Sequence, residues 1–228
     1  MRGCFELALE LALEDDYIYD GTLEGFLTVA VRCFRKHKMP HSIVPDYMVM
    51  GRAEENFYTN VLTSVKDSGH LLDLIGNIAT PEVQQNVTDY FLTCSRNKEL
   101  ILFTYIYKAL TVGAPIAEDY SDKTVLKIRR AVEDLYREAQ SLLPAIDFYT
   151  RDNVSTAVID PHNCVLPILK GPIFRREYLE DIALYDKRHF LLLRRSGEVS
   201  EIVDVRKMLI PEIRNAEDVY TRIWLPAS

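Results

Sequence analysis

The sequence predicts an α+β protein with an N-terminal strand–helix unit, a mainly helical middle segment and a C-terminal antiparallel sheet. The apolar residues recur with a helical period through the middle of the chain and with a strand-like period after Pro144. Of the 228 residues, 48% are hydrophobic, which is enough for one sizeable core. We therefore expect a single domain over residues 1–228, with a possible helical subdomain at 53–143.

The first expected elements are a strand and a helix. Tyr17–Tyr19 has the composition of a short strand, and Asp20-Gly21-Thr22 is typical of a turn that starts a helix, with Thr22 as the N-cap. Apolar residues at i, i+3, i+4 and i+7 spacing then predict a helix over residues 23–34. Pro40 and Pro45 indicate the loop that follows.

The middle of the chain is expected to be helical throughout residues 53–112, beginning with an apolar stripe from Phe57 to Val65. Thr80-Pro81-Glu82 is a strong helix start, and a further helix is expected from about Lys98 to Gly113. The longest helix should cover residues 122–143 and end at Pro144.

After Pro144 the sequence predicts strands. Residues 146–150 and 154–159 have the pattern of a hairpin, and three more strands are expected at 182–185, 190–193 and 199–205, the last two joined at Ser196-Gly197. Two prolines interrupt residues 165–174, which favours short helical turns over one helix. Residues 211–224 are expected to form a short helix and an extended end.

Charge and motifs exclude several classes of protein. The net charge of −7 gives no global attraction to phosphate or anionic lipid, so any anion-binding surface must be local. The four cysteines are widely spaced, which predicts no metal site, no cofactor and the reduced thiols of a cytoplasmic protein. No stretch approaches the roughly 18–20 apolar residues of a membrane span, so no membrane partner is expected.

The stretch 170–195 is the best candidate for a nucleic-acid surface. It holds seven cations against four carboxylates, interleaved with aromatic residues that can stack on bases. An ordinary sheet whose Lys and Arg protect an edge strand explains the same composition, and this alternative stays open. Arg129 and Arg130 are possible further contacts. The candidate binding residues are Lys170, Arg175, Arg176, Lys187, Arg188, Arg194 and Arg195.

Asp20 and Glu24 are the weak candidates for catalysis. Their i, i+4 spacing could place both carboxylates near a helix N-terminus, where the helix dipole favours the ionised form. A turn residue and an ordinary first-turn acid account for the same pair, and this simpler interpretation is favoured.

The order of several short motifs resembles a bacterial family known only as probable DNA-metabolism proteins. The opening motif is YIYDGTLEGFL at residues 17–27. It is followed by Asp122 with Val125 and Ile128, and then by the hairpin at 146–159. VLPIL at 165–169, FRR at 174–176 and LYD at 184–186 complete the series. The resemblance covers residues 17–205, and the chain departs from the family pattern at Gln140, Ser141 and Ile173, so it resembles a divergent member.

The resemblance implies an accessory protein in DNA repair or modification. Family members are associated with a radical-SAM iron–sulfur protein, and some relatives are fused to a uracil-DNA glycosylase-like domain. We therefore expect DNA and such an iron–sulfur protein as possible partners, and no catalytic residue is carried over. Two alternatives remain: a protein-interaction subunit without nucleic-acid contact, and, less favoured, a nucleobase-acting hydrolase or glycosylase-like enzyme.

Overall fold

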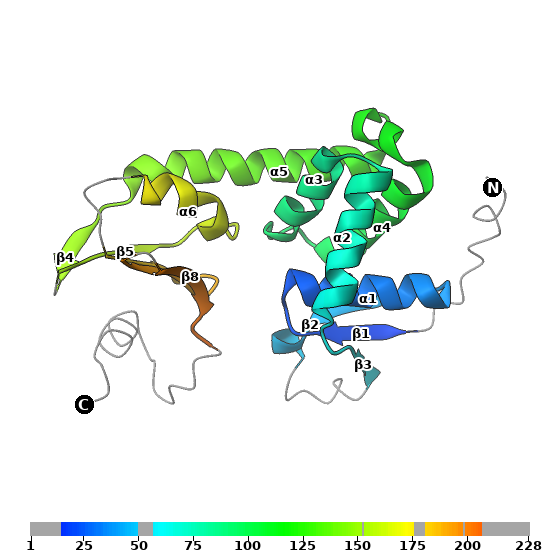
Figure 1. Ribbon diagram of the computed structural model, residues 1–228, viewed down its shortest axis with the longest axis horizontal. Coiled ribbons are helices and arrows are strands. Elements are labelled where there is room, and N and C mark those ends of the chain that lie inside the picture. The colour runs from blue at the N-terminus through cyan, green and yellow to red at the C-terminus, as the bar shows by residue number, and fades with distance from the viewer. Residues whose placement is uncertain (1–14, 50–56, 152, 176–180, 198, 207–228) are drawn as a thin grey trace. The chain divides into compact units, whose positions relative to one another are not determined.

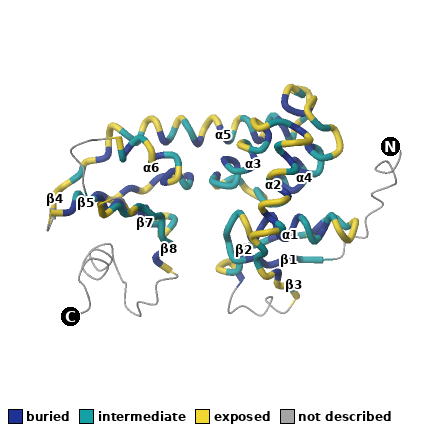
Figure 2. The backbone as a smooth tube through the Cα atoms, in the orientation of Figure 1, coloured by how far each residue is buried: buried dark blue, intermediate teal, exposed yellow. Residues whose placement is uncertain are grey.

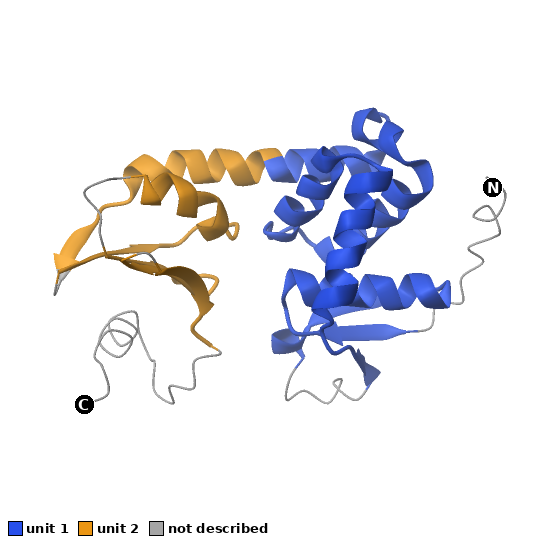
Figure 3. Cartoon of the chain, viewed as in Figure 1, with its two compact units in different colours: residues 1–132 blue, residues 133–228 orange. Residues whose placement is uncertain are grey.

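The computed structural model describes residues 15–49, 57–151, 153–175, 181–197 and 199–206. It confirms the α+β class, and the chain divides into two compact units, residues 1–132 and 133–228 (Figure 3). The boundary lies within one long helix, at a position that no sequence signal marked. The helical subdomain expected at 53–143 stays a prediction.

A three-stranded parallel sheet opens the first unit, in the order β2-β1-β3 (Figure 1). The central strand is β1 (Asp16–Tyr19), flanked by β2 (Ser42–Pro45) and β3 (Thr59–Asn60). Helix α1 (Leu23–Lys36) connects β1 to β2, and the Thr22 side chain caps it by accepting from the Gly25 amide at 3.0 Å. The expected strand–helix unit is thus confirmed, with two more strands added to it.

The prediction of a helix with an apolar stripe from Phe57 to Val65 is wrong. Thr59 and Asn60 form β3, and the chain stays extended to Val61, whose amide donates to the Ile18 carbonyl oxygen at 3.0 Å. Helix α2 (Val65–Ile78) begins only after Ser64, whose hydroxyl caps it. Pairing with β1, which is distant in sequence, overrides the local helical pattern here.

The remaining helices of the first unit are α3 (Pro81–Phe91), α4 (Lys98–Val112) and the start of α5 (Lys123–Leu142). The expected helix starts at Thr80-Pro81 and near Lys98 are confirmed, as is the long helix. α1 packs on α2, α2 on α3 and α3 on α4. Their buried side chains form the core of this unit and include Phe26, Ile75, Val83, Tyr90, Ile106 and Ile128.

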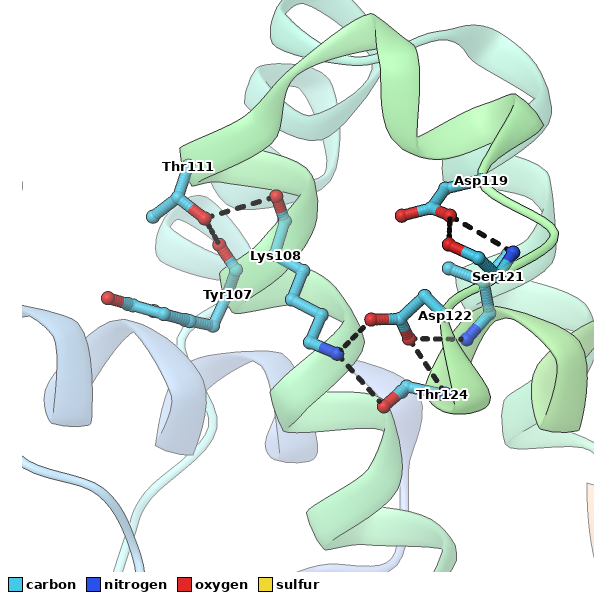
Figure 4. Close-up of polar contacts among 8 residues, drawn as sticks. Tyr107, Lys108, Thr111, Asp119, Ser121, Asp122 and Thr124 are labelled. Atoms are coloured by element: carbon cyan, nitrogen blue, oxygen red, sulfur yellow. Dashed lines mark hydrogen bonds and ion pairs between the residues drawn. The ribbon is translucent and has the colours of Figure 1, made fainter.

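The N-terminus of α5 is fixed by a polar cluster (Figure 4). The Asp122 carboxylate accepts hydrogen bonds from the Thr124 and Val125 amides at 2.7 and 3.1 Å. The Lys108 ammonium group contacts both Asp122 and the Thr124 hydroxyl. This ion pair and these hydrogen bonds hold the pKa of the Asp122 carboxyl below its usual range.

The second unit is built on a five-stranded sheet in the order β4-β5-β6-β7-β8. Its strands are β4 (Tyr149–Arg151), β5 (Val154–Ile159), β6 (Ile182–Asp186), β7 (Leu191–Ser196) and β8 (Val199–Asp204). Both predicted hairpins are confirmed, the second with Gly197 at φ +57°. All five residues of β6 are buried. Figure 2 shows how buried and exposed residues are distributed along the described chain.

The sheet is mixed rather than antiparallel, because β5 and β6 run parallel. Helix α6 (Leu166–Phe174) makes the crossover between them and is one helix, not a series of short turns. Pro167 lies in the first turn, where no intrahelical N–H is needed, and Pro172 lies two residues from the end. The two prolines concealed the helix in the sequence, and with it the parallel pair.

Residues 211–224 lie outside the described residues. Among the helices in the described ranges, none combines the length and apolar character needed to cross a membrane.

Candidate nucleic-acid interface

Two of the predicted cations, Lys170 and Arg195, lie over the Phe174 ring, and Arg175 follows Phe174 directly in the chain. We call Lys170, Phe174, Arg175 and Arg195 the Phe174 cluster. Lys170 and Phe174 are four residues apart on α6, so they share one side of the helix, and Arg175 follows its last turn. β7 packs against α6 and supplies Arg195. The Arg195 guanidinium carbon lies 5.3 Å from the ring centroid and the Lys170 ammonium nitrogen 5.9 Å from it.

The positive charges of the Phe174 cluster are not paired with carboxylates in the described chain, so they can attract a phosphate group. Arg195 donates to two carbonyl oxygens, those of Phe174 at 3.4 Å and Gly197 at 3.2 Å. Within the part of the chain that the structure describes, Lys170, Arg175 and Arg195 form no ion pair with a carboxylate. The helix dipole favours positive charge at the C-terminus of α6, where Arg175 lies.

Three other candidate cations form ion pairs with two carboxylates. Lys187 and Arg188 both contact Asp160, at 3.1 and 2.9 Å, and they hold the pKa of that carboxyl below its usual range. The Arg194 guanidinium donates to Glu201 on the neighbouring strand, with a Nε–Oε1 distance of 2.6 Å. Each of these cations is paired with a carboxylate, so the group attracts phosphate less than the unpaired cations of the Phe174 cluster. Arg176 lies outside the described residues.

The sheet register separates Arg195 from Lys187 and Arg188. Arg195 lies opposite Ile182 at the start of β6, whereas Lys187 and Arg188 follow Asp186 at its end. Four residue steps along a strand span about 13 Å. The structure therefore brings Lys170 and Arg195 to one ring, with Arg175 next to it in the chain, and places Lys187 and Arg188 at the other end of β6 from Arg195.

Helix α5 carries a second set of cations in the first unit. Arg129 is engaged, because it lies over the Tyr120 ring at 4.8 Å and pairs with Glu82 at 2.8 Å. Arg130 is exposed, and so are Lys123 and Lys127, at i, i+4 and i+7 spacing on one stripe. Among the described residues none of these three forms an ion pair. The two lysines were not predicted as contacts, although the spacing of charged residues could have indicated the stripe.

Asp20 has a structural task in the turn after β1. Its carboxylate accepts hydrogen bonds from the Thr22 amide at 3.0 Å, the Thr22 hydroxyl at 2.6 Å and the Thr63 hydroxyl at 2.9 Å. These bonds join the start of α1 to the chain after β3. Glu24 is exposed in the first turn of α1. The geometry accounts for Asp20 without chemistry, and a catalytic role for either residue stays a prediction.

No metal centre is evident in the described ranges, where no group of three His, Cys, Asp or Glu side chains could hold an ion. Among the described residues, Cys33, Cys94 and Cys164 form no disulfide, and Cys4 lies outside them. Burial raises the pKa of the Cys33 thiol to about 11, so this side chain behaves as a small core residue.

No protein-family model, curated protein or solved structure matches the chain. The resemblance to DNA-metabolism proteins therefore stays a prediction.

Proposed function

We propose that the protein binds DNA through the Phe174 cluster, as an accessory factor in DNA repair or modification. The observation that supports this most is the pair of cations over the Phe174 ring, Lys170 and Arg195, with Arg175 next to Phe174 in the chain. None of the three has a carboxylate partner in the described chain. Lys and Arg supply the phosphate contacts that dominate affinity for nucleic acids.

Single-stranded DNA suits the Phe174 cluster better than duplex DNA. Its bases are free to stack on an aromatic ring while the backbone follows neighbouring cations. The Phe174 side chain is half-buried, and the Lys170 and Arg195 cations lie 5.9 and 5.3 Å from its ring centroid, so a base at the exposed part of the ring would have phosphate partners close by. We therefore expect the single strand to bind more tightly.

The cellular role rests on the sequence. The order of motifs from residue 17 to residue 205 supports a place beside a radical-SAM iron–sulfur protein, which would carry the chemistry. In the described chain, no disulfide joins Cys33, Cys94 or Cys164, which fits a reducing compartment, and we propose a cytoplasmic location.

Fluorescence anisotropy with labelled single- and double-stranded DNA tests the proposal. We expect saturable binding at low salt and at least tenfold weaker binding by the triple variant Lys170→Gln, Arg175→Gln and Arg195→Gln. The matched control replaces Lys187, Arg188 and Arg194 by Gln, which also removes three positive charges, and should change the affinity less.

A double variant, Lys170→Gln with Arg175→Gln, leaves the Arg195 hydrogen bonds in place and guards against a folding defect. Equal loss of affinity in the triple variant and the control would assign binding to net charge alone. Absence of binding at low salt would refute DNA contact and favour the alternative of a protein-interaction subunit.

A further inference from the structure

Four large apolar side chains are exposed beyond the carboxyl ends of β2 and β3, the two outer strands of the N-terminal parallel sheet. Tyr47 and Met48 follow β2, and Leu62 and Val65 follow β3. Their exposed fractions are 55, 51, 85 and 74%. We call these four residues the sheet-edge surface. Scattered exposed apolar residues are normal, whereas a contiguous apolar patch on the surface marks an interaction site.

The carboxyl end of β1 brings both halves of the sheet-edge surface together. The Tyr47 ring lies 3.0 Å from the position that a Cβ atom on Gly21 would occupy, directly after β1. On the other side of β1, Leu62 lies between Val61, which bonds to Ile18, and Thr63, which bonds to Asp20. Since β2 and β3 both pair with β1, these two flanks are about 10 Å apart.

Hydrogen bonds hold the segment that carries Leu62 and Val65 in place. The Ser64 amide donates to the Thr28 hydroxyl at 3.1 Å, and the Ser64 hydroxyl caps α2. The apolar side chains are therefore presented from a fixed backbone, which lowers the entropy lost when a partner binds.

The charge around the sheet-edge surface is negative. The segments 20–24, 45–48 and 61–66 hold three carboxylates, of Asp20, Glu24 and Asp46, against one ammonium group, of Lys66. In the described chain the Glu24 and Asp46 carboxylates take part in no hydrogen bond or ion pair. This part of the sequence is acidic more widely, since residues 1–122 hold 18 Asp and Glu against 10 Lys and Arg.

We propose that the sheet-edge surface docks a segment of a partner protein that is both apolar and basic, such as an amphipathic helix with Lys or Arg beside its apolar face. Apolar burial would supply affinity, and the basic groups would meet Glu24 and Asp46. A second copy of this chain is the poorer occupant, because a symmetric contact would bring the same carboxylates face to face.

The test uses a fluorescein-labelled amphipathic peptide of Leu and Lys, and a second peptide in which Glu replaces every Lys. We expect saturable binding of the basic peptide, at least tenfold weaker for the variant Leu62→Ser/Val65→Ser, and no binding of the acidic peptide. The matched control, Val158→Ser/Val199→Ser, removes two exposed valines from the second unit and should bind like the unmodified protein.

Amide chemical shifts locate the contact. Shifts confined to residues near Gly21, Leu62 and Val65 would support the proposal. Equal binding by both serine variants, or shifts elsewhere, would overturn it, as would a dimer that Leu62→Ser/Val65→Ser abolishes. DNA affinity should be unchanged in this variant, and peptide binding unchanged in the Phe174-cluster variant, so either proposal can fail alone.

Discussion

Replacing Gly25 by Ala tests the structural role given to Asp20. Gly25 lies in the first turn of α1, and a Cβ atom built on it would lie 2.2 Å from the Asp20 carboxylate oxygen Oδ1 and 3.0 Å from the Thr63 hydroxyl. Cβ atoms do not approach an oxygen so closely. The added methyl group must therefore push the Asp20 carboxylate away from the hydrogen bonds it accepts.

The magnitude follows from the bonds at risk. Asp20 accepts three hydrogen bonds, two from Thr22 and one from Thr63, and each is worth about 1 kcal/mol in the free energy of unfolding. The usual gain of about 1 kcal/mol for replacing Gly by Ala in a helix offsets part of that loss. We expect Gly25→Ala to lower the free energy of unfolding by about 2 kcal/mol net.

Urea unfolding followed by circular dichroism measures this change, with Gly69→Ala as the matched control. Gly69 is an exposed position of α2, and nothing lies within 4 Å of a Cβ atom built there. This control should raise the free energy of unfolding by about 0.5–1 kcal/mol. Equal stability of the two variants would refute the description of the β1–α1 turn.

Two further predictions concern the ends of α5. Asp122→Asn should lower the free energy of unfolding at neutral pH, and this free energy should then fall less as the pH is lowered. In the folded protein the Asp122 pKa lies below its unfolded value of 3.8. The stability that the carboxylate contributes is therefore present above pH 3.8 and is lost as the pH falls through the folded-state pKa. An acid-unfolding profile that Asp122→Asn leaves unchanged would contradict this. Glu138→Ala removes the carboxylate that accepts hydrogen bonds from the His162 and Asn163 backbone amides and from the Asn163 side chain. We expect it to lower the free energy of unfolding, measured with urea, by about 2 kcal/mol. A loss below about 0.5 kcal/mol would contradict these hydrogen bonds.

The sequence predicts those elements whose signals are local. α1 and α5 combine a continuous apolar stripe with clear ends, at Thr22 and Pro144 respectively. The β7–β8 hairpin has its turn at Gly197. Each of these features depends on residues close together in the chain, so periodicity and turn chemistry suffice.

The elements that escaped prediction depend on distant contacts. β3 has two residues and exists only through its pairing with β1, about 40 positions earlier. The parallel pair of β5 and β6 requires α6 as a crossover, and two prolines concealed that helix. Parallel pairing leaves little local signal, because the strands are joined through an intervening segment rather than a tight turn.

The candidate interface also depends on contacts between residues that are distant in the sequence. Composition identified the cations of residues 170–195, but it could not show which of them are neutralised. Asp160 pairs with Arg188, 28 positions later, and Arg194 meets Glu201 only through the register of two strands. The gathering around Phe174 likewise depends on α6 packing against β7.

The dependence of DNA affinity on salt tests the central claim most directly. Each phosphate contact with single-stranded DNA contributes about 0.7 to the slope of log affinity against log salt. If Lys170, Arg175 and Arg195 each contact a phosphate, replacing all three by Gln should make the slope shallower by about 2, while the control at Lys187, Arg188 and Arg194 keeps a slope closer to that of the unmodified protein. Parallel slopes for the unmodified protein and the Phe174-cluster variant would contradict the account.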